Sequence, residues 1–105
     1  MSDIQIGELY LVKEFFWFLF PTKELARRGS SSTSGWRRRR RARVAWRNAK
    51  WLSQEFKCNV SVVEPNTCVV LLEEDENFFK VLDSNGNIGW IRCRDFSDFF
   101  ELVKE

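Results

Sequence analysis

Short apolar segments separated by turn residues fill the second half of this 105-residue chain, and their spacing constrains the fold more than any other feature. The segments are five or six residues long and rich in β-branched or aromatic side chains, which suit pleated strands. They cover residues 58–63, 68–72, 78–82 and 88–92.

The stretches between these segments carry turn chemistry. Glu64–Thr67 has Pro65 in its second place, residues 73–77 form a polar loop, and Asp83–Asn87 contains the Asn-Gly pair of tight hairpins. Strands that recur about every ten residues predict a small antiparallel sandwich or barrel.

The first half offers one further strand, over residues 6–12, which can extend through an aromatic run to Phe20. Pro21 stops it, and residues 22–26 predict a helical turn that Gly29 ends. At the other end, helical spacing is shared by Phe96, Phe99, Phe100 and Val103. A one-turn helix from Asp95, followed by a strand over residues 99–103, is the alternative.

Charge is divided unevenly along the chain. Nine arginines fall between Arg27 and Arg47, and five of them are consecutive. Residues 13–57 carry a net charge of +10, whereas residues 1–12 carry −2 and residues 58–105 carry −6. This asymmetry indicates a polyanion, or an acidic protein surface, as the partner of the middle of the chain.

The basic region runs into a segment over residues 43–56 with the pattern of an amphipathic helix. An apolar stripe combines Ala42, Ala45, Ala49, Leu52 and Phe56, and the opposite face combines Arg39, Arg43, Arg47, Lys50 and Gln54. Such a helix docks its small-residue face on the sheet and presents its guanidinium groups outward.

Guanidinium groups suit phosphate because they are planar, remain charged and donate two parallel hydrogen bonds. The predicted phosphate contacts are Arg37, Arg38, Arg39, Arg40, Arg41, Arg43 and Arg47, with Lys50 at the edge. Trp46 borders the apolar stripe and Trp51 lies nearer the basic side. Any of Trp36, Trp46 and Trp51 can stack on an unpaired base.

The stretch from Trp36 to Trp46 resembles the arginine-rich RNA-binding peptides of lentiviral Rev and of lambdoid phage antitermination proteins. Those peptides likewise combine clustered arginines, helix formers and a tryptophan. The resemblance favours RNA as the partner and leaves DNA open.

Residues 60–91 resemble a Src-homology-3-like small barrel in the order of their parts. The parts are a strand, a diverging turn, a strand, an acidic loop, the pair Phe78-Phe79, the Asn-Gly hairpin and then Gly89-Trp90-Ile91. Residues 6–12 resemble the first strand of that fold. The resemblance implies a short helical turn and a last strand after Ile91, so it favours the one-turn helix and strand over residues 95–103. It also implies a buried Trp90.

The departures from that family bear on function. Arg92 stands where the peptide-binding members carry a proline, Asp95 stands where they carry a groove tyrosine, and Val12 replaces a tyrosine of the first strand. A proline-rich peptide ligand is therefore not expected. The loop after the first strand is enlarged and contains the whole arginine segment.

We therefore predict a mainly β fold: a small antiparallel barrel, Src-homology-3-like, with a basic helical insertion. Residues 1–105 form a single domain, residues 13–57 are the enlarged loop or insertion with the basic helix, and residues 58–105 supply the barrel strands.

The aromatic run needs cover on both faces, because alternation along a strand buries only one of them. The insertion helix or another chain can provide it. Since apolar patches of this size mark interfaces, the sequence predicts a protein interface at Phe15, Phe16, Trp17, Phe18 and Phe20.

Several classes of function find no support in the sequence. The chain has no histidine, and its three cysteines form no CxxC pair, so we expect no metal and no cofactor. Its longest apolar stretch has six residues, whereas a spanning helix needs about twenty. Neither a secretory signal nor a membrane span is expected, and no catalytic residue or small-molecule substrate can be assigned.

The leading prediction is a non-enzymatic nucleic-acid-binding module, with RNA favoured, in the cytoplasm or within a viral particle. The alternative is a structural subunit of a virion or a ribonucleoprotein, which uses the aromatic run and the arginines as protein interfaces.

Overall fold

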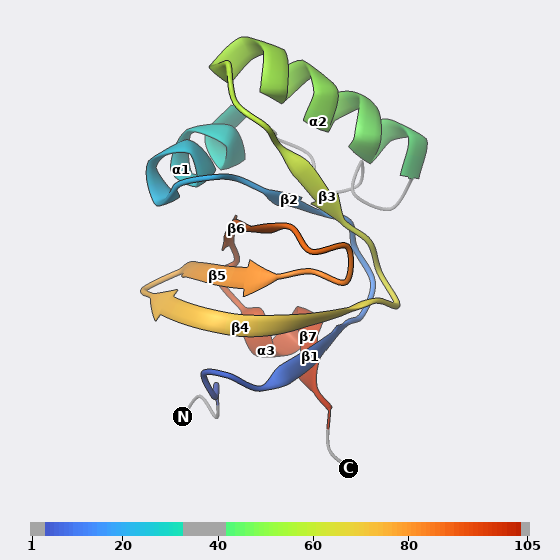
Figure 1. Ribbon diagram of the computed structural model, residues 1–105, viewed down its shortest axis with the longest axis vertical. Helices are drawn as coiled ribbons and strands as arrows, with labels where there is room; N and C mark the ends of the chain where they lie inside the picture. The colour runs from blue at the N-terminus through green and yellow to red at the C-terminus, as the bar shows by residue number, and fades with distance from the viewer. Residues whose placement is uncertain (1–3, 33–41, 104–105) are drawn as a thin grey trace.

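The computed structural model describes residues 4–32 and 42–103 and shows a mainly β chain (Figure 1). The strands are β1 (Leu9–Val12), β2 (Trp17–Leu19), β3 (Ser61–Val63), β4 (Cys68–Asp75), β5 (Phe78–Leu82), β6 (Ile88–Arg92) and β7 (Phe100–Leu102). The helices are α1 (Lys23–Ser32), α2 (Ala42–Phe56) and α3 (Phe96–Phe99).

Five strands form one antiparallel sheet in the order β6-β5-β4-β1-β7, and β2 pairs with β3 in a second sheet. An isolated bridge between Phe20 and Trp90 joins the two sheets. The prediction of a mainly β, antiparallel fold is confirmed. The predicted barrel does not close by strand pairing, because β6 and β7 are both edges of the five-stranded sheet among the described strands.

The turn residues of the sequence correctly predicted the bounds of two strands in the second half of the chain. β5 and β6 have the predicted bounds, and α3 followed by β7 corresponds to the second alternative for the end of the chain. The predicted polar loop over residues 73–77 is wrong, because Glu73, Glu74 and Asp75 continue β4 and pair with β5. A two-residue turn at Glu76–Asn77 suffices, and Glu76 takes a left-handed conformation there with φ 55°.

The first half departs more from its prediction. The chain bends after β1, so the aromatic run starts a separate strand that pairs with β3. The predicted helix stop at Gly29 is also wrong, because α1 runs through it to Ser32. Gly29 is buried, and a Cβ atom there would overlap the ring of Phe20. The glycine permits close packing of α1 rather than ending it.

Capping hydrogen bonds lie at the start of α1 and at the end of α2. At the start of α1, the Thr22 side-chain hydroxyl accepts a hydrogen bond from the backbone N–H of Leu25 at 3.2 Å. After α2, Lys57 is left-handed with φ 53°, and the N–H of Cys58 donates to the carbonyl of Ser53 at 3.1 Å. This Schellman arrangement turns the chain into β3.

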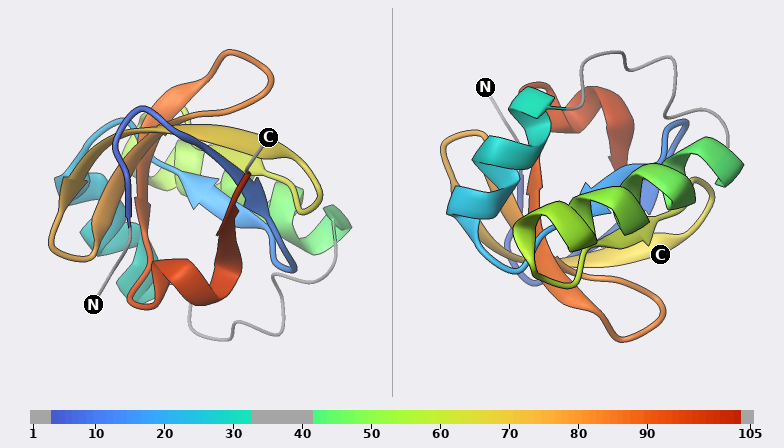
Figure 2. Two further views of the ribbon diagram at one scale, coloured as in Figure 1. Left: turned by 90° about the horizontal axis from the view of Figure 1, so that it is seen from below. Right: turned by 90° about the horizontal axis from the view of Figure 1, so that it is seen from above.

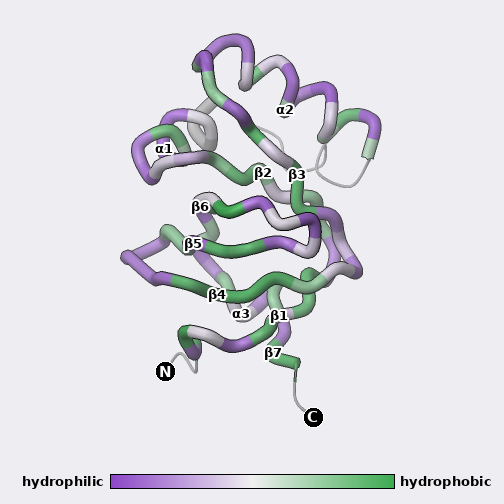
Figure 3. Tube along the Cα trace, viewed as in Figure 1, coloured by the Kyte–Doolittle hydropathy of each residue, from purple (hydrophilic) through white to green (hydrophobic). Residues whose placement is uncertain are grey.

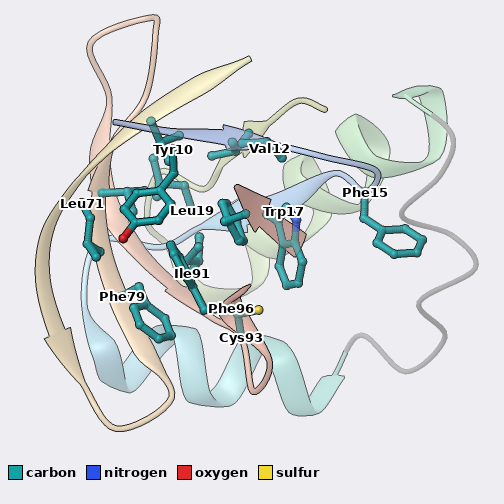
Figure 4. Close-up of a cluster of buried hydrophobic side chains, with 14 residues drawn as sticks. Tyr10, Val12, Phe15, Trp17, Leu19, Leu71, Phe79, Ile91, Cys93 and Phe96 are labelled. Carbon is teal, nitrogen blue, oxygen red and sulfur yellow. The ribbon is translucent and has the colours of Figure 1, made fainter. Parts of the chain in front are cut away.

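Two apolar clusters fill the molecule. The first lies between the five-stranded sheet, β2 and α3. Figure 4 shows Tyr10, Leu71, Phe79, Ile91 and other side chains converging there. The second lies between the sheets and the two longer helices. Its buried members are Phe16, Phe18, Phe20, Ala26, Ala45, Ala49, Leu52, Val60, Val62 and Phe78.

The aromatic run divides its side chains between these clusters. Phe15, Trp17 and Leu19 belong to the first cluster. Phe16, Phe18 and Phe20 belong to the second, beneath α1 and α2. β2 therefore lies between two hydrophobic layers.

Trp90 does not occupy the position predicted for it. Ile91 is fully buried in the first cluster, whereas Trp90 is half-buried and packs on the edge of the second. Side chains alternate along a strand, so Ile91 and Trp90 face opposite sides of β6. The ammonium group of Lys23 lies 5.4 Å from the Trp90 ring.

Candidate nucleic-acid interface

Helix α2 covers the end of the molecule opposite β1 and β7 (Figures 1 and 2). Ala45, Ala49 and Leu52 are buried against β3 and β2, while Arg43, Arg47 and Lys50 are exposed. This is the orientation that the residue spacing predicts, except that Ala42 is exposed and Phe56 only half-buried. We refer to Arg43, Arg47, Lys50, Trp46 and Trp51 as the basic face.

Small residues bring α2 close to the strands beneath it, since alanine adds little bulk at the contact. Ser53 then fixes the end of the helix: its hydroxyl donates to the carbonyl of Ala49 at 2.8 Å and accepts from the N–H of Val60 at 2.9 Å. In Figure 3, hydrophilic and hydrophobic segments alternate along α2, as expected for a helix with one polar and one apolar side.

Two tryptophans lie among the cations of the basic face. Trp46 is 45% exposed and Trp51 is 53% exposed, which is unusual for the largest apolar side chain. The indole N–H of Trp46 donates to a carboxylate oxygen of Glu64 at 3.3 Å, so the turn after β3 holds that ring. Both rings leave part of their surface available for stacking.

Helix α1 adds two exposed arginines that were not among the predicted site residues. The Arg28 guanidinium lies 5.1 Å from the ring of Phe56 in α2, and the Arg27 guanidinium lies 5.5 Å from the ring of Phe78. The sequence signal that could have identified them as site residues is their membership of the group of nine arginines between Arg27 and Arg47. Their aromatic partners are distant in sequence and could not be read from it.

Five of the predicted phosphate contacts, Arg37, Arg38, Arg39, Arg40 and Arg41, lie outside the described residues. They directly precede Ala42, the first residue of α2.

The predicted protein interface needs correction. Phe15, Phe16, Trp17, Phe18 and Phe20 are all buried within the chain, at 8% exposure or less. The five-stranded sheet covers one side of the run, and helices α1 and α2 cover the other. The predicted insertion helix therefore supplies only part of the cover. The run presents no exposed aromatic patch in this structure.

Acidic side chains gather on the β4–β5 hairpin, away from the basic face. Asp75 pairs with Lys23, and Glu73 pairs with Lys80 at 3.2 Å. Both pairs are exposed, so each contributes ~0–1 kcal/mol to stability. Four acidic residues of the second half therefore lie on this hairpin, whereas Glu64 lies beside Trp46 of the basic face.

Other kinds of site are not evident in the described residues. No group of three His, Cys, Asp or Glu side chains within residues 4–32 and 42–103 is placed to hold a metal ion. The cysteines are free, and burial raises the pKa of the Cys58 thiol. No described helix is long and apolar enough to span a membrane.

Neither a protein-family model, nor a curated protein, nor a solved structure matches this chain.

Proposed function

We propose that the protein is a non-enzymatic nucleic-acid-binding module that uses α2, and that RNA is its preferred ligand. One observation carries the proposal: three exposed cations and two exposed tryptophans share the basic face, while the opposite side of α2 is anchored in the second cluster. Phosphate contacts by guanidinium groups and base stacking on indole rings are the two standard components of single-strand binding.

We infer that the remaining strands act as a Src-homology-3-like scaffold for this helix. The strand order β6-β5-β4-β1-β7, with a short helix before the last strand, supports that inference. The segment between β1 and β4 then corresponds to the enlarged loop, which extends beyond the predicted residues 13–57 to include β3. Both β2 and β3 within it contribute to the core. Loops on a rigid scaffold are common sites of function.

The alternative role, as a subunit of a virion or ribonucleoprotein, loses one of its two supports because the aromatic run is interior. The arginines remain suited to an acidic protein surface. Failure to bind any nucleic acid would therefore favour that role.

Salt dependence of RNA binding tests the proposal. If about five phosphates are contacted, the slope of log K against log[salt] is about −3.5 for single strands, and each lost contact reduces it by about 0.7. Replacing Arg43, Arg47 and Lys50 together by Ser should reduce the slope by about 2. Fluorescence anisotropy with RNA hairpins, single strands and duplex DNA provides the measurement.

The matched control is the double variant Arg43→Lys with Arg47→Lys. It keeps the charge, so the slope should stay unchanged, but it loses the two-pronged hydrogen bonding, so affinity should fall modestly. Binding weaker than about 10 µM to every nucleic acid at low salt, where non-specific contacts are strong, would overturn the proposal.

A further inference from the structure

A cavity of about 210 Å³ lies between the segment before β2, the end of β6 and α3, and no residue of the basic face lines it. Phe15, Trp17 and Phe99 supply its aromatic lining, and Arg94 and Asp95 lie on its polar side. We refer to this cavity as the aromatic pocket.

The aromatic lining is held in place by its own packing. Phe99 meets Phe15 edge-on at 5.3 Å between ring centres and meets Trp17 edge-on at 5.4 Å. Phe15 and Trp17 are buried, whereas Phe99 is half-buried. Figure 4 shows Trp17 within the first cluster and Phe15 at its margin.

The polar side of the aromatic pocket carries one cationic and one anionic side chain, which form no ion pair with each other. Arg94 and Asp95 are both exposed, and the structure gives neither side chain a hydrogen bond or ion pair with a described residue. Asp95 precedes α3 but makes no side-chain capping hydrogen bond. Arg92, the other basic residue of the lining, lies 5.7 Å from the ring of Phe78.

Size and chemistry together select a class of ligand. The volume is below the ~300–1,000 Å³ typical of pockets for drug-sized molecules, so one ring system fits better than a peptide segment. An aromatic lining favours a flat ring, a guanidinium group favours a phosphate, and a carboxylate only accepts hydrogen bonds.

We propose that the aromatic pocket binds an unpaired guanine nucleotide, an inference that rests on the RNA-binding function proposed above. The base lies against the aromatic lining, chiefly against the half-buried Phe99, because Phe15 and Trp17 are buried and already contact Phe99. Asp95 accepts hydrogen bonds from the Watson–Crick edge of the base. Arg94 contacts the adjoining phosphate. The pocket thereby adds base preference to the sequence-independent attraction of the basic face.

The preference for guanine follows from its donors. Guanine presents two neighbouring donors on its Watson–Crick edge, the N1–H and the 2-amino group, which match the two oxygens of a carboxylate. Adenine and cytosine place an acceptor beside their amino group, and uracil has one donor between two carbonyl oxygens. Each of these bases would direct an acceptor toward Asp95.

Mononucleotides test the pocket without the basic face. We expect 5′-GMP to bind the full chain at least about fivefold more tightly than 5′-AMP, the low end of what a two-pronged base contact supplies. Inosine monophosphate, which lacks the 2-amino group, should fall between them. Titration calorimetry measures the affinities, and proton–nitrogen spectra should show shifts at Arg94, Asp95 and the Trp17 indole.

Three variants assign the roles. Asp95→Asn should abolish the preference of GMP over AMP, while Arg94→Ser should weaken both nucleotides but leave guanosine, which has no phosphate, unaffected. Asp98→Asn is the matched control, because Asp98 is an exposed carboxylate of α3 that does not line the pocket. Equal melting temperatures verify that the variants fold.

Equal affinity for GMP and AMP, or spectral shifts confined to α2, would overturn this proposal. The two proposals fail separately. RNA binding without a guanine preference leaves the function of α2 standing and removes the pocket. GMP binding in the pocket, together with no RNA binding, removes the function of α2.

Discussion

At the scale of single residues, Gly29 sets how closely α1 approaches the rest of the molecule. It is buried within a helix, where glycine normally lowers stability. Its missing side chain makes room for the ring of Phe20, which is itself almost fully buried. The cost in helix propensity therefore accompanies a packing contact that any larger residue would disturb.

Gly29→Ala tests which of these effects is larger. Alanine improves helix propensity by ~1 kcal/mol, but overpacking at a crowded site costs ~1–3 kcal/mol. Because the ring of Phe20 has little space to move, we expect a net loss of stability in urea denaturation. In a Phe20→Leu background the same change should be less harmful, and a gain of ~1 kcal/mol in the parent chain would contradict this view.

At the scale of elements, α2 has an anchoring side and a ligand side that should respond differently to substitution. Leu52→Ala should lower the free energy of unfolding by ~2–5 kcal/mol, because Leu52 is fully buried in the second cluster.

Its neighbour Trp51 is the comparison. Trp51→Ala should change stability by less than ~0.5 kcal/mol, because the side chain is exposed, but it should weaken binding to single-stranded RNA by ~1–3 kcal/mol if a base stacks there. Chemical denaturation and anisotropy on the same samples separate the two effects. Equal losses of stability in both variants would show that the two sides of α2 are not distinct.

Elements defined by local signals were predictable from sequence. The spacing of Ala45, Ala49 and Leu52 predicted the buried side of α2, and the Asn85-Gly86 pair predicted the β5–β6 hairpin. Features that depend on distant residues were not predictable. The role of Gly29 depends on Phe20, and the inward direction of Ile91 rather than Trp90 depends on how β6 pairs with β5.

The same contrast between local signals and contacts of distant residues applies to the candidate sites. Arg43 and Arg47 follow from charge and periodicity, which are local properties. The aromatic pocket joins Phe15, from the start of the aromatic run, to Arg94 and Asp95 near the end of the chain. No sequence spacing links residues that far apart, so only the fold brings them together.

At the scale of the whole molecule, the two clusters share β2, so the scaffold and α2 should unfold together. The segment that can be replaced without unfolding the protein should therefore be shorter than the enlarged loop. Residues 27–32 belong to α1, whose Gly29 is buried, whereas residues 33–41 lie between the two described ranges.

Replacing residues 33–41 with a short Gly/Ser linker should leave the melting temperature nearly unchanged, since each doubling of loop length costs only about 0.6 kcal/mol. Replacing residues 27–41 should destabilise the protein, because it removes more than half of α1 and the packing against Phe20. Circular dichroism melting curves compare the two chains. Similar loss in both would mean that residues 33–41 are needed for folding.

Because β2 lies between two hydrophobic layers, its register with β3 is determined differently from that of a strand with one polar face. In a strand with one polar face, a slip by one residue exposes apolar side chains and is strongly opposed. In β2 such a slip would only exchange one large apolar side chain for another, so polarity does not select the alignment with β3. Steric fit must therefore select the alignment of β2 with β3. Two features supply that fit: the space beside Gly29 that the Phe20 ring fills, and the backbone bridge between Phe20 and Trp90. Exchanging Phe18 and Leu19 would preserve the composition and hydropathy of the strand and still disturb its alignment.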